Sequence, residues 1–139
     1  MGMKNRNWLA GIGLVAYCSF IFYLSSLPGG SIGFLPFSDK VKHFFLYLVL
    51  GSIFAYFLKN LKSGLTWIMI GTATFFFTLL YGLSDEIHQL LVPGRTFDLI
   101  DLLVDTIGGT SGGLLILVLH EFSRTPGRVS TKNKGRNLQ

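Results

Sequence analysis

Long uncharged apolar runs recur along this chain, and they constrain its fold more than any other feature. Residues 8–27 and 65–84 are two twenty-residue stretches without a charged side chain. A helix of about 20 apolar residues crosses a hydrocarbon core about 30 Å thick. Inside that core only a helix or a closed barrel satisfies every backbone polar group. The sequence therefore predicts an all-α integral membrane protein.

Two further segments have shorter uncharged runs, at residues 44–58 and 106–119. Because these runs fall short of a full span, we expect the polar ends of their helices to lie in the membrane interface. Pro-Gly sequences after Leu27 and Val92 break the apolar pattern. We predict a four-transmembrane-helix bundle with a short re-entrant or interfacial break around residues 91–97. The predicted helices cover about 8–27, 38–60, 65–90 and 96–120.

The basic residues predict the topology of this bundle. Of twelve Lys and Arg residues, nine fall on one side of the predicted membrane and three on the other. The positive-inside rule then places both termini in the cytoplasm. We predict a cytoplasmic N-terminus at 1–7, a membrane domain at 8–121 and a disordered basic cytoplasmic tail at 122–139. Five basic residues lie in that terminal region, and no basic groove with interleaved aromatics is evident, so we expect no nucleic-acid partner.

Four glycines repeat at helical spacing in the last predicted helix: Gly108, Gly109, Gly112 and Gly113. Small residues four positions apart allow the backbones of membrane helices to approach closely. The pattern predicts tight packing within the bundle, and a homo-oligomer formed through these glycines is the alternative.

Ionisable residues gather at the predicted outward-facing helix ends. Six of the seven carboxylates belong to this group, together with two histidines. Its acids and histidines are Asp39, Asp85, Glu86, Asp98, Asp101, Asp105, His43 and His88. Asp39 and His43 are four residues apart, and Asp98, Asp101 and Asp105 follow the i, i+3, i+7 pattern, so each set shares one helix face.

Only Lys40, Lys42 and Arg95 oppose these six acids. Protons retained on some groups, charged histidines, a bound cation or a cationic ligand group would each compensate the excess negative charge. A structural network in which Lys40 and Arg95 bridge the carboxylates is one reading. Since ionisable residues at membrane depth are costly, a functional site is the other.

Several sequence elements in this region resemble the VanZ-like family. They are Asp39-Lys40-x-x-His43-Phe44, Glu86-x-x-Gln89, Pro93-Gly94-Arg95 and Asp98-x-x-Asp101. The resemblance covers about residues 24–117. One departure is Asp105, which stands where the family usually has Asn.

The resemblance implies a bacterial cell-envelope protein of the cytoplasmic membrane, in a family associated with teicoplanin resistance. We expect the outward cluster to recognise an envelope lipid, a glycan or a lipoglycopeptide. A metal-assisted enzyme acting on envelope lipids and a structural or partner-binding module are the alternatives.

The candidate catalytic residues are Asp39, His43, Glu86, Asp98 and Asp101. The candidate ligand-binding residues are Lys40, Asp85, His88, Gln89, Arg95 and Asp105. A divalent metal would bind at His43, Glu86 and Asp101.

Overall fold

The computed structural model describes residues 3–28, 38–61 and 64–124, and the regular structure in these residues is α-helical. All four helices are long and apolar enough to cross a membrane. Their bounds are α1 Met3–Ser25, α2 Asp39–Leu61, α3 Trp67–Gln89 and α4 Leu99–Arg124. The predicted four-helix membrane bundle is therefore confirmed.

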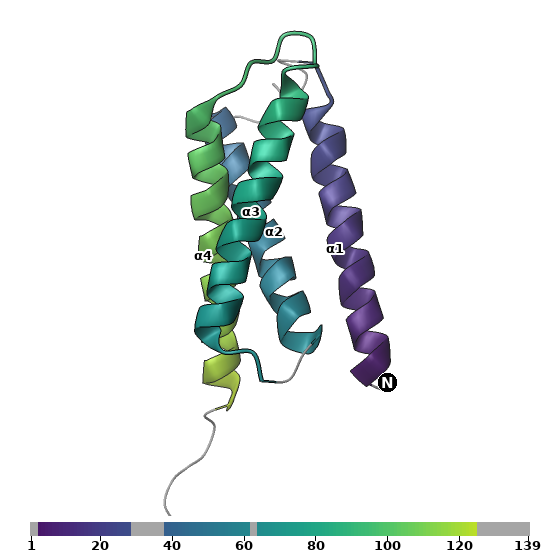
Figure 1. The fold of residues 1–139 in the computed structure, drawn as a ribbon, viewed down its shortest axis with the longest axis vertical. Helices are drawn as coiled ribbons and strands as arrows, with labels where there is room; N and C mark the ends of the chain where they lie inside the picture. Colours follow the sequence, from purple (N-terminus) through teal and green to yellow (C-terminus); the bar gives the residue numbers. More distant parts are fainter. Residues whose placement is uncertain (1–2, 29–37, 62–63, 125–139) are drawn as a thin grey trace, which may run out of the picture.

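Successive helices run antiparallel, so both ends of the bundle gather segments distant in sequence (Figure 1). The end of α1, the start of α2, the end of α3 and the start of α4 meet at the end that carries residues 90–98. We call it the 90–98 end. The N-terminus lies at the opposite end (Figure 1). The helix ends that carry the predicted acidic group therefore lie at the same end of the molecule.

Helices α2 and α4 share the most extensive interface, and glycine makes their close approach possible. A Cβ on Gly51 of α2 would overlap the backbone of Gly109 in α4. On Gly108 and Gly112, a Cβ would overlap backbone atoms of Phe44 and Leu48 in α2. These glycines therefore pack within the bundle, as the sequence predicts.

Helix α4 also packs closely on α3 through small residues. A Cβ on Gly109 would overlap the side chain of Thr78, and one on Gly113 would lie 2.8 Å from Cγ2 of Thr74. Both threonines satisfy their hydroxyls on carbonyls of their own helix. All four glycines of α4 are thus occupied within the chain. A homo-oligomer formed through these glycines stays a prediction.

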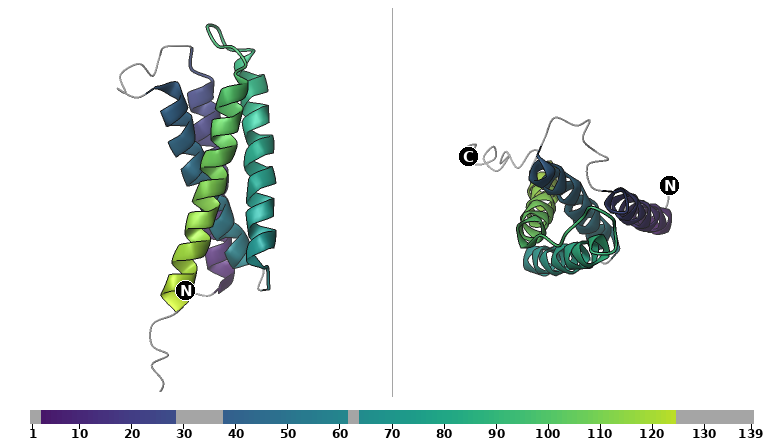
Figure 2. Two further views of the ribbon diagram at one scale, coloured as in Figure 1. Left: turned by 90° about the vertical axis from the view of Figure 1, so that its left-hand side faces the viewer. Right: turned by 90° about the horizontal axis from the view of Figure 1, so that it is seen from above.

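Helix α1 lies outside the triangle formed by the other three helices (Figure 2). It is the least buried of the four spans. Ile21 packs into a core cluster with Tyr47 and Leu50, and the Tyr17 hydroxyl donates to the Leu46 carbonyl at 3.1 Å. These contacts attach α1 to α2 along one side.

The helices extend beyond the apolar runs at both chain ends. α1 begins at Met3, although the sequence prediction started this helix at residue 8. α4 continues through Arg124, so residues 122–124 are helical and were wrongly assigned to the tail. The reason is that Lys and Arg are good helix formers, so loss of apolarity marks the membrane boundary and not the helix end. The rest of the predicted tail lies outside the described residues.

The connection between α3 and α4 contains a tight turn. The Arg95 amide donates to the Val92 carbonyl at 3.1 Å, and Gly94 has φ +75°. Proline at the second position and a positive φ at the third are typical of a type II turn. The side chain of Val92 is buried beneath it. This turn brings residues 95–98 back over the end of the bundle.

Candidate functional site

The site is built from an ion-pair layer at the 90–98 end and a buried layer beneath it. In the outer layer Lys40 bridges two carboxylates of the α4 start. Its Nζ lies 2.8 Å from Oδ2 of Asp98 and 2.8 Å from Oδ1 of Asp101. One lysine therefore offsets much of the charge of two acids and joins the first turns of α2 and α4.

Asp98 also caps α4. Its Oδ1 accepts from the Ile100 amide at 2.8 Å, which satisfies one of the free amides at the helix start. The Lys40 ammonium, helped by this backbone amide, holds the pKa of the Asp98 carboxyl below its usual value. Asp98 is thus an ionised residue that fixes the position of the α4 start.

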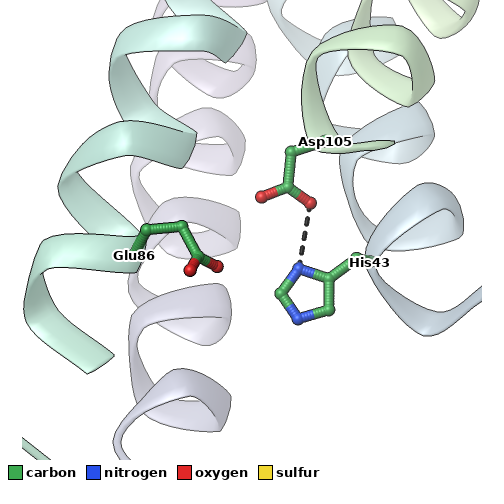
Figure 3. A group of neighbouring side chains, drawn as sticks. All are labelled: His43, Glu86 and Asp105. Carbon is green, nitrogen blue, oxygen red and sulfur yellow. Dashed lines mark hydrogen bonds and ion pairs between the residues drawn. The ribbon is translucent and has the colours of Figure 1, made fainter. Parts of the chain in front are cut away.

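The buried layer joins side chains from three helices: His43 of α2, Glu86 of α3 and Asp105 of α4 (Figure 3). We call these three residues the His–carboxylate cluster. Nδ1 of His43 lies 3.0 Å from Oδ1 of Asp105, and Asp105 and Glu86 are both 0% exposed. Asp105 lies six residues into α4, about 9 Å along the axis from its start. The cluster is therefore below the rim of the bundle and within the spans.

A chain of polar contacts positions Glu86. Its Oε2 accepts from the Asp98 backbone amide at 2.8 Å, which ties α3 to the connection. Gln89 donates from Nε2 to Oδ2 of Asp85 at 3.1 Å and accepts from Arg95 at 3.3 Å. The Gln89 side chain thus connects the Arg95 guanidinium to the buried carboxylate of Asp85 through two hydrogen bonds.

Arg95 itself is held between two helices. Besides Gln89, its guanidinium donates to the Leu27 carbonyl at 3.2 Å and to the Leu24 carbonyl at 3.5 Å. These carbonyls follow or belong to the last turn of α1, where helical partners run out. Arg95 therefore attaches α1 to the 90–98 end. In the described residues it reaches the cluster through Gln89, whose Nε2 donates to Oε1 of Glu86 at 3.5 Å.

Two polar atoms near the cluster are buried and have no hydrogen-bond partner among the residues that the structure describes. They are Oδ2 of Asp105 and the hydroxyl of Tyr47, which is 1% exposed. Tyr47 lies one turn beyond His43 on α2, and its hydroxyl is within range of the charges of Asp105, Asp85 and Glu86. Figure 3 shows the free oxygen of Asp105 on the side facing Glu86. Such atoms call for a donor, a cation or a ligand, because a buried polar group without a partner is costly.

Sequence reasoning did not single out Tyr47. Its spacing of four residues from His43, which continues the pattern of Asp39 and His43, is the signal that would have found it. Asp39 itself is the first residue of α2. Its side chain is 78% exposed and pairs with Lys42 at 2.9 Å, away from the buried layer.

The remaining predicted residues divide between the two layers and the α1 side. Asp85 and Gln89 are buried beside the cluster. Asp101 pairs with Lys40, and the three residues whose ligand atoms could share an ion include Asp105 in place of Asp101. His88 faces α1, where Nε2 is 2.9 Å from the Ser26 hydroxyl and the ring stacks on Phe22. The catalytic and ligand-binding roles of these residues stay predictions.

This arrangement has two chemical capabilities. Asp85, Glu86 and Asp105 offer buried oxygen acceptors, with His43 as the neighbouring imidazole, so the cluster suits a hydroxyl, an ammonium group or a cation. His43 is also oriented by a carboxylate, as general bases commonly are. By contrast, an anion alone would be repelled by these acids.

Comparison with known proteins places this chain in a family. The VanZ/LLP1 family model matches residues 12–120. An uncharacterized protein of Schizosaccharomyces pombe is 27% identical over 108 residues, which cover 78% of this chain and 60% of that protein. The chain thus matches less than two thirds of that relative's length. No solved structure matches. Since the family model matches most of the chain and includes every residue of the cluster, this chain belongs to the VanZ/LLP1 family.

Proposed function

We propose that this chain is a cell-envelope membrane protein that recognises the polar head of an envelope lipid or glycan, or a lipoglycopeptide. The observation that carries the proposal is the convergence of His43, Glu86 and Asp105 in the bundle, with Oδ2 of Asp105 lacking a partner. A sugar hydroxyl or an ammonium group donates to such an oxygen. Recognition would therefore use hydrogen bonds that the described part of the chain does not make.

The position of the cluster supports an amphiphilic ligand. The three residues lie within a few helical turns of the 90–98 end, while apolar side chains cover the outside of the spans. A molecule with a polar head and an apolar tail matches both surroundings. With nine basic residues on the opposite side against three, the 90–98 end would face outward from a bacterial cytoplasmic membrane.

Teicoplanin is one ligand class within this proposal, since the family takes its name from a resistance-associated protein. Resistance would then follow from binding either the drug or the envelope lipid near which it acts.

A matched pair of Glu→Gln variants tests the proposal. Glu86→Gln removes one charge from the cluster, and Glu121→Gln removes the same charge near the far end of α4. Binding of teicoplanin and of a polyprenyl-diphosphate-linked disaccharide would be measured to each protein in nanodiscs. We expect saturable binding of one probe that weakens about 10- to 100-fold in Glu86→Gln, the usual cost of losing a charged hydrogen bond. Equal binding by both variants, or no binding by the unmodified chain, would refute the proposal.

The His43 geometry favours a second candidate, an acid–base enzyme acting on an envelope lipid. Its Nδ1 is held by Asp105 at 3.0 Å, which leaves Nε2 to exchange a proton with a bound substrate. The test is turnover of polyprenyl-phosphate and phospholipid substrates by the chain and by His43→Ala. Absence of turnover in every substrate class would exclude this candidate and leave recognition in place.

A further inference from the structure

We infer that the His–carboxylate cluster is a binding site for one divalent cation of the zinc class, with His43, Glu86 and Asp105 as its protein ligands. The cation site lies in the proposed recognition site, so this inference rests on the proposed function and adds the class of ion bound there. One ligand atom of each residue lies within 4.8 Å of the others. The three ligands come from three different helices, so a shared ion would clamp α2, α3 and α4 together.

The distances suit an ion after a small closure. Ligand atoms bound at 2.0–2.2 Å in a tetrahedral site stand about 3.5 Å apart. The ligand atoms therefore need to approach one another by about 1 Å when the ion binds. His43 and Asp105 already lie 3.0 Å apart, and Glu86 accepts from the Asp98 amide at 2.8 Å. The Asp98 amide is an outer contact of the kind that holds metal ligands in place.

The unpartnered oxygen of Asp105 is the second, independent observation. Oδ2 is buried, the residue is 0% exposed, and this oxygen points to the side of Glu86 (Figure 3). A cation between Asp105 and Glu86 would satisfy it. The Tyr47 hydroxyl, also buried and without a partner, offers its oxygen or a bridge to a metal-bound water in the same region.

Charge leads to the same conclusion. Lys40 is engaged by Asp98 and Asp101 at the rim, and Arg95 reaches the cluster through Gln89. The buried Glu86 and Asp105 have His43 as their nearest basic group, and Asp85 adds a third acid beside them. A divalent ion would balance two carboxylates without a buried salt bridge.

The ligand types select the class of metal. Ca²⁺ and Mg²⁺ prefer oxygen ligands throughout, whereas an imidazole nitrogen with two carboxylates suits Zn²⁺. Three protein ligands also leave a position open for water or for a ligand oxygen. That open position would let an acidic site accept a phosphate or hydroxyl of a lipid head.

Asp105→Asn provides the sharpest variant. It is nearly isosteric and removes one of the two carboxylate charges among the proposed ligands. Glu121→Gln is the control for loss of one charge from the same helix. The full chain in nanodiscs, stripped with a chelator, would be titrated with Zn²⁺ against a chromophoric chelator, with excess Mg²⁺ present.

The expected result is one equivalent of Zn²⁺ bound by the unmodified chain and by Glu121→Gln. Asp105→Asn should bind more than about 100-fold more weakly, because loss of an outer contact alone costs 10- to 100-fold. No Zn²⁺ binding by the unmodified chain, or equal binding by Asp105→Asn, would overturn the inference.

Two safeguards keep the test decisive. If Asp105→Asn does not fold, Glu86→Gln takes its place. X-ray absorption of the zinc-loaded unmodified chain gives an answer without variants: a shell of nitrogen and oxygen at about 2.0–2.2 Å including one imidazole supports the site, and a shell without imidazole overturns it. Because Zn²⁺ is the only ligand used, failure here removes the cation and leaves lipid or glycan recognition to its own binding assay.

Discussion

Gly51→Ala is expected to force α2 away from α4 and to destabilise the bundle. A Cβ at this position would fall on the carbonyl oxygen of Gly109, and it would lie 2.5 Å and 2.7 Å from the carbonyl carbon and Cα of that residue. All three are backbone atoms, so no side-chain rotation relieves the overlap. The two helices must separate at their closest contact.

The cost follows from what that separation loses. Overpacking a well-packed core typically costs about 1–3 kcal/mol. Here the shift also loosens Gly108 and Gly112 against α2, and a gap of about 0.5–1 Å forfeits a quarter to a half of the dispersion energy of each contact. We expect a loss of about 2–4 kcal/mol in the free energy of unfolding.

Gly13→Ala is the matched control, since a Cβ there meets nothing within 4 Å. It should be neutral or stabilising by up to about 1 kcal/mol, because alanine is the better helix former. Both variants would be unfolded by increasing SDS in mixed micelles and followed by circular dichroism. If Gly51→Ala unfolds within about 0.5 kcal/mol of Gly13→Ala, the backbone contact between α2 and α4 is refuted.

Three further predictions concern the polar network at the 90–98 end. Arg95→Lys loses the fork that bonds an α1 carbonyl and Gln89 together, so stability should fall by about 1–2 kcal/mol and limited proteolysis of the connection should quicken; unchanged proteolysis would contradict this. Lys40 lowers the pKa of Asp98, so the stabilisation from that carboxylate is complete above about pH 4 and is lost as pH falls through the lower folded-state pKa. Asp98→Asn should flatten the thermal stability profile in that acidic range, and a profile parallel to that of the unmodified chain would refute it. Gln89→Leu leaves the buried carboxylate of Asp85 without its donor and should cost about 1–3 kcal/mol in SDS unfolding, whereas a loss below about 0.5 kcal/mol would be inconsistent with this hydrogen bond.

The fold could be predicted because the bilayer leaves few options. Uncharged runs of about 20 residues admit a spanning helix, and the breaks at Pro28 and Pro93 separate neighbouring helices. Helix ends were less predictable. Residues 3–7 and 122–124 are helical although polar side chains occur among them, because helix propensity extends past the apolar boundary.

The sequence indicated which acidic and histidine residues gather at the 90–98 end. It did not indicate which of them lie at the rim and which are buried. Periodicity placed Asp98, Asp101 and Asp105 on one face of α4, yet the first two bind Lys40 at the rim while Asp105 reaches His43 a turn deeper. Depth along a helix depends on where the helix begins and on how the helices are aligned. Spacing alone does not give either quantity. The partnerless hydroxyl of Tyr47 depends on the same alignment.

The most direct test of ligand recognition by the His–carboxylate cluster is a complementation experiment in cells. A strain lacking this chain would receive the unmodified chain, Glu86→Gln or Glu121→Gln at matched membrane abundance. Teicoplanin sensitivity and the envelope lipid profile would then be measured. We expect Glu121→Gln to restore both properties and Glu86→Gln to behave like the deletion. Full restoration by Glu86→Gln, or a deletion that changes neither property, would contradict a ligand-recognising cluster at the 90–98 end.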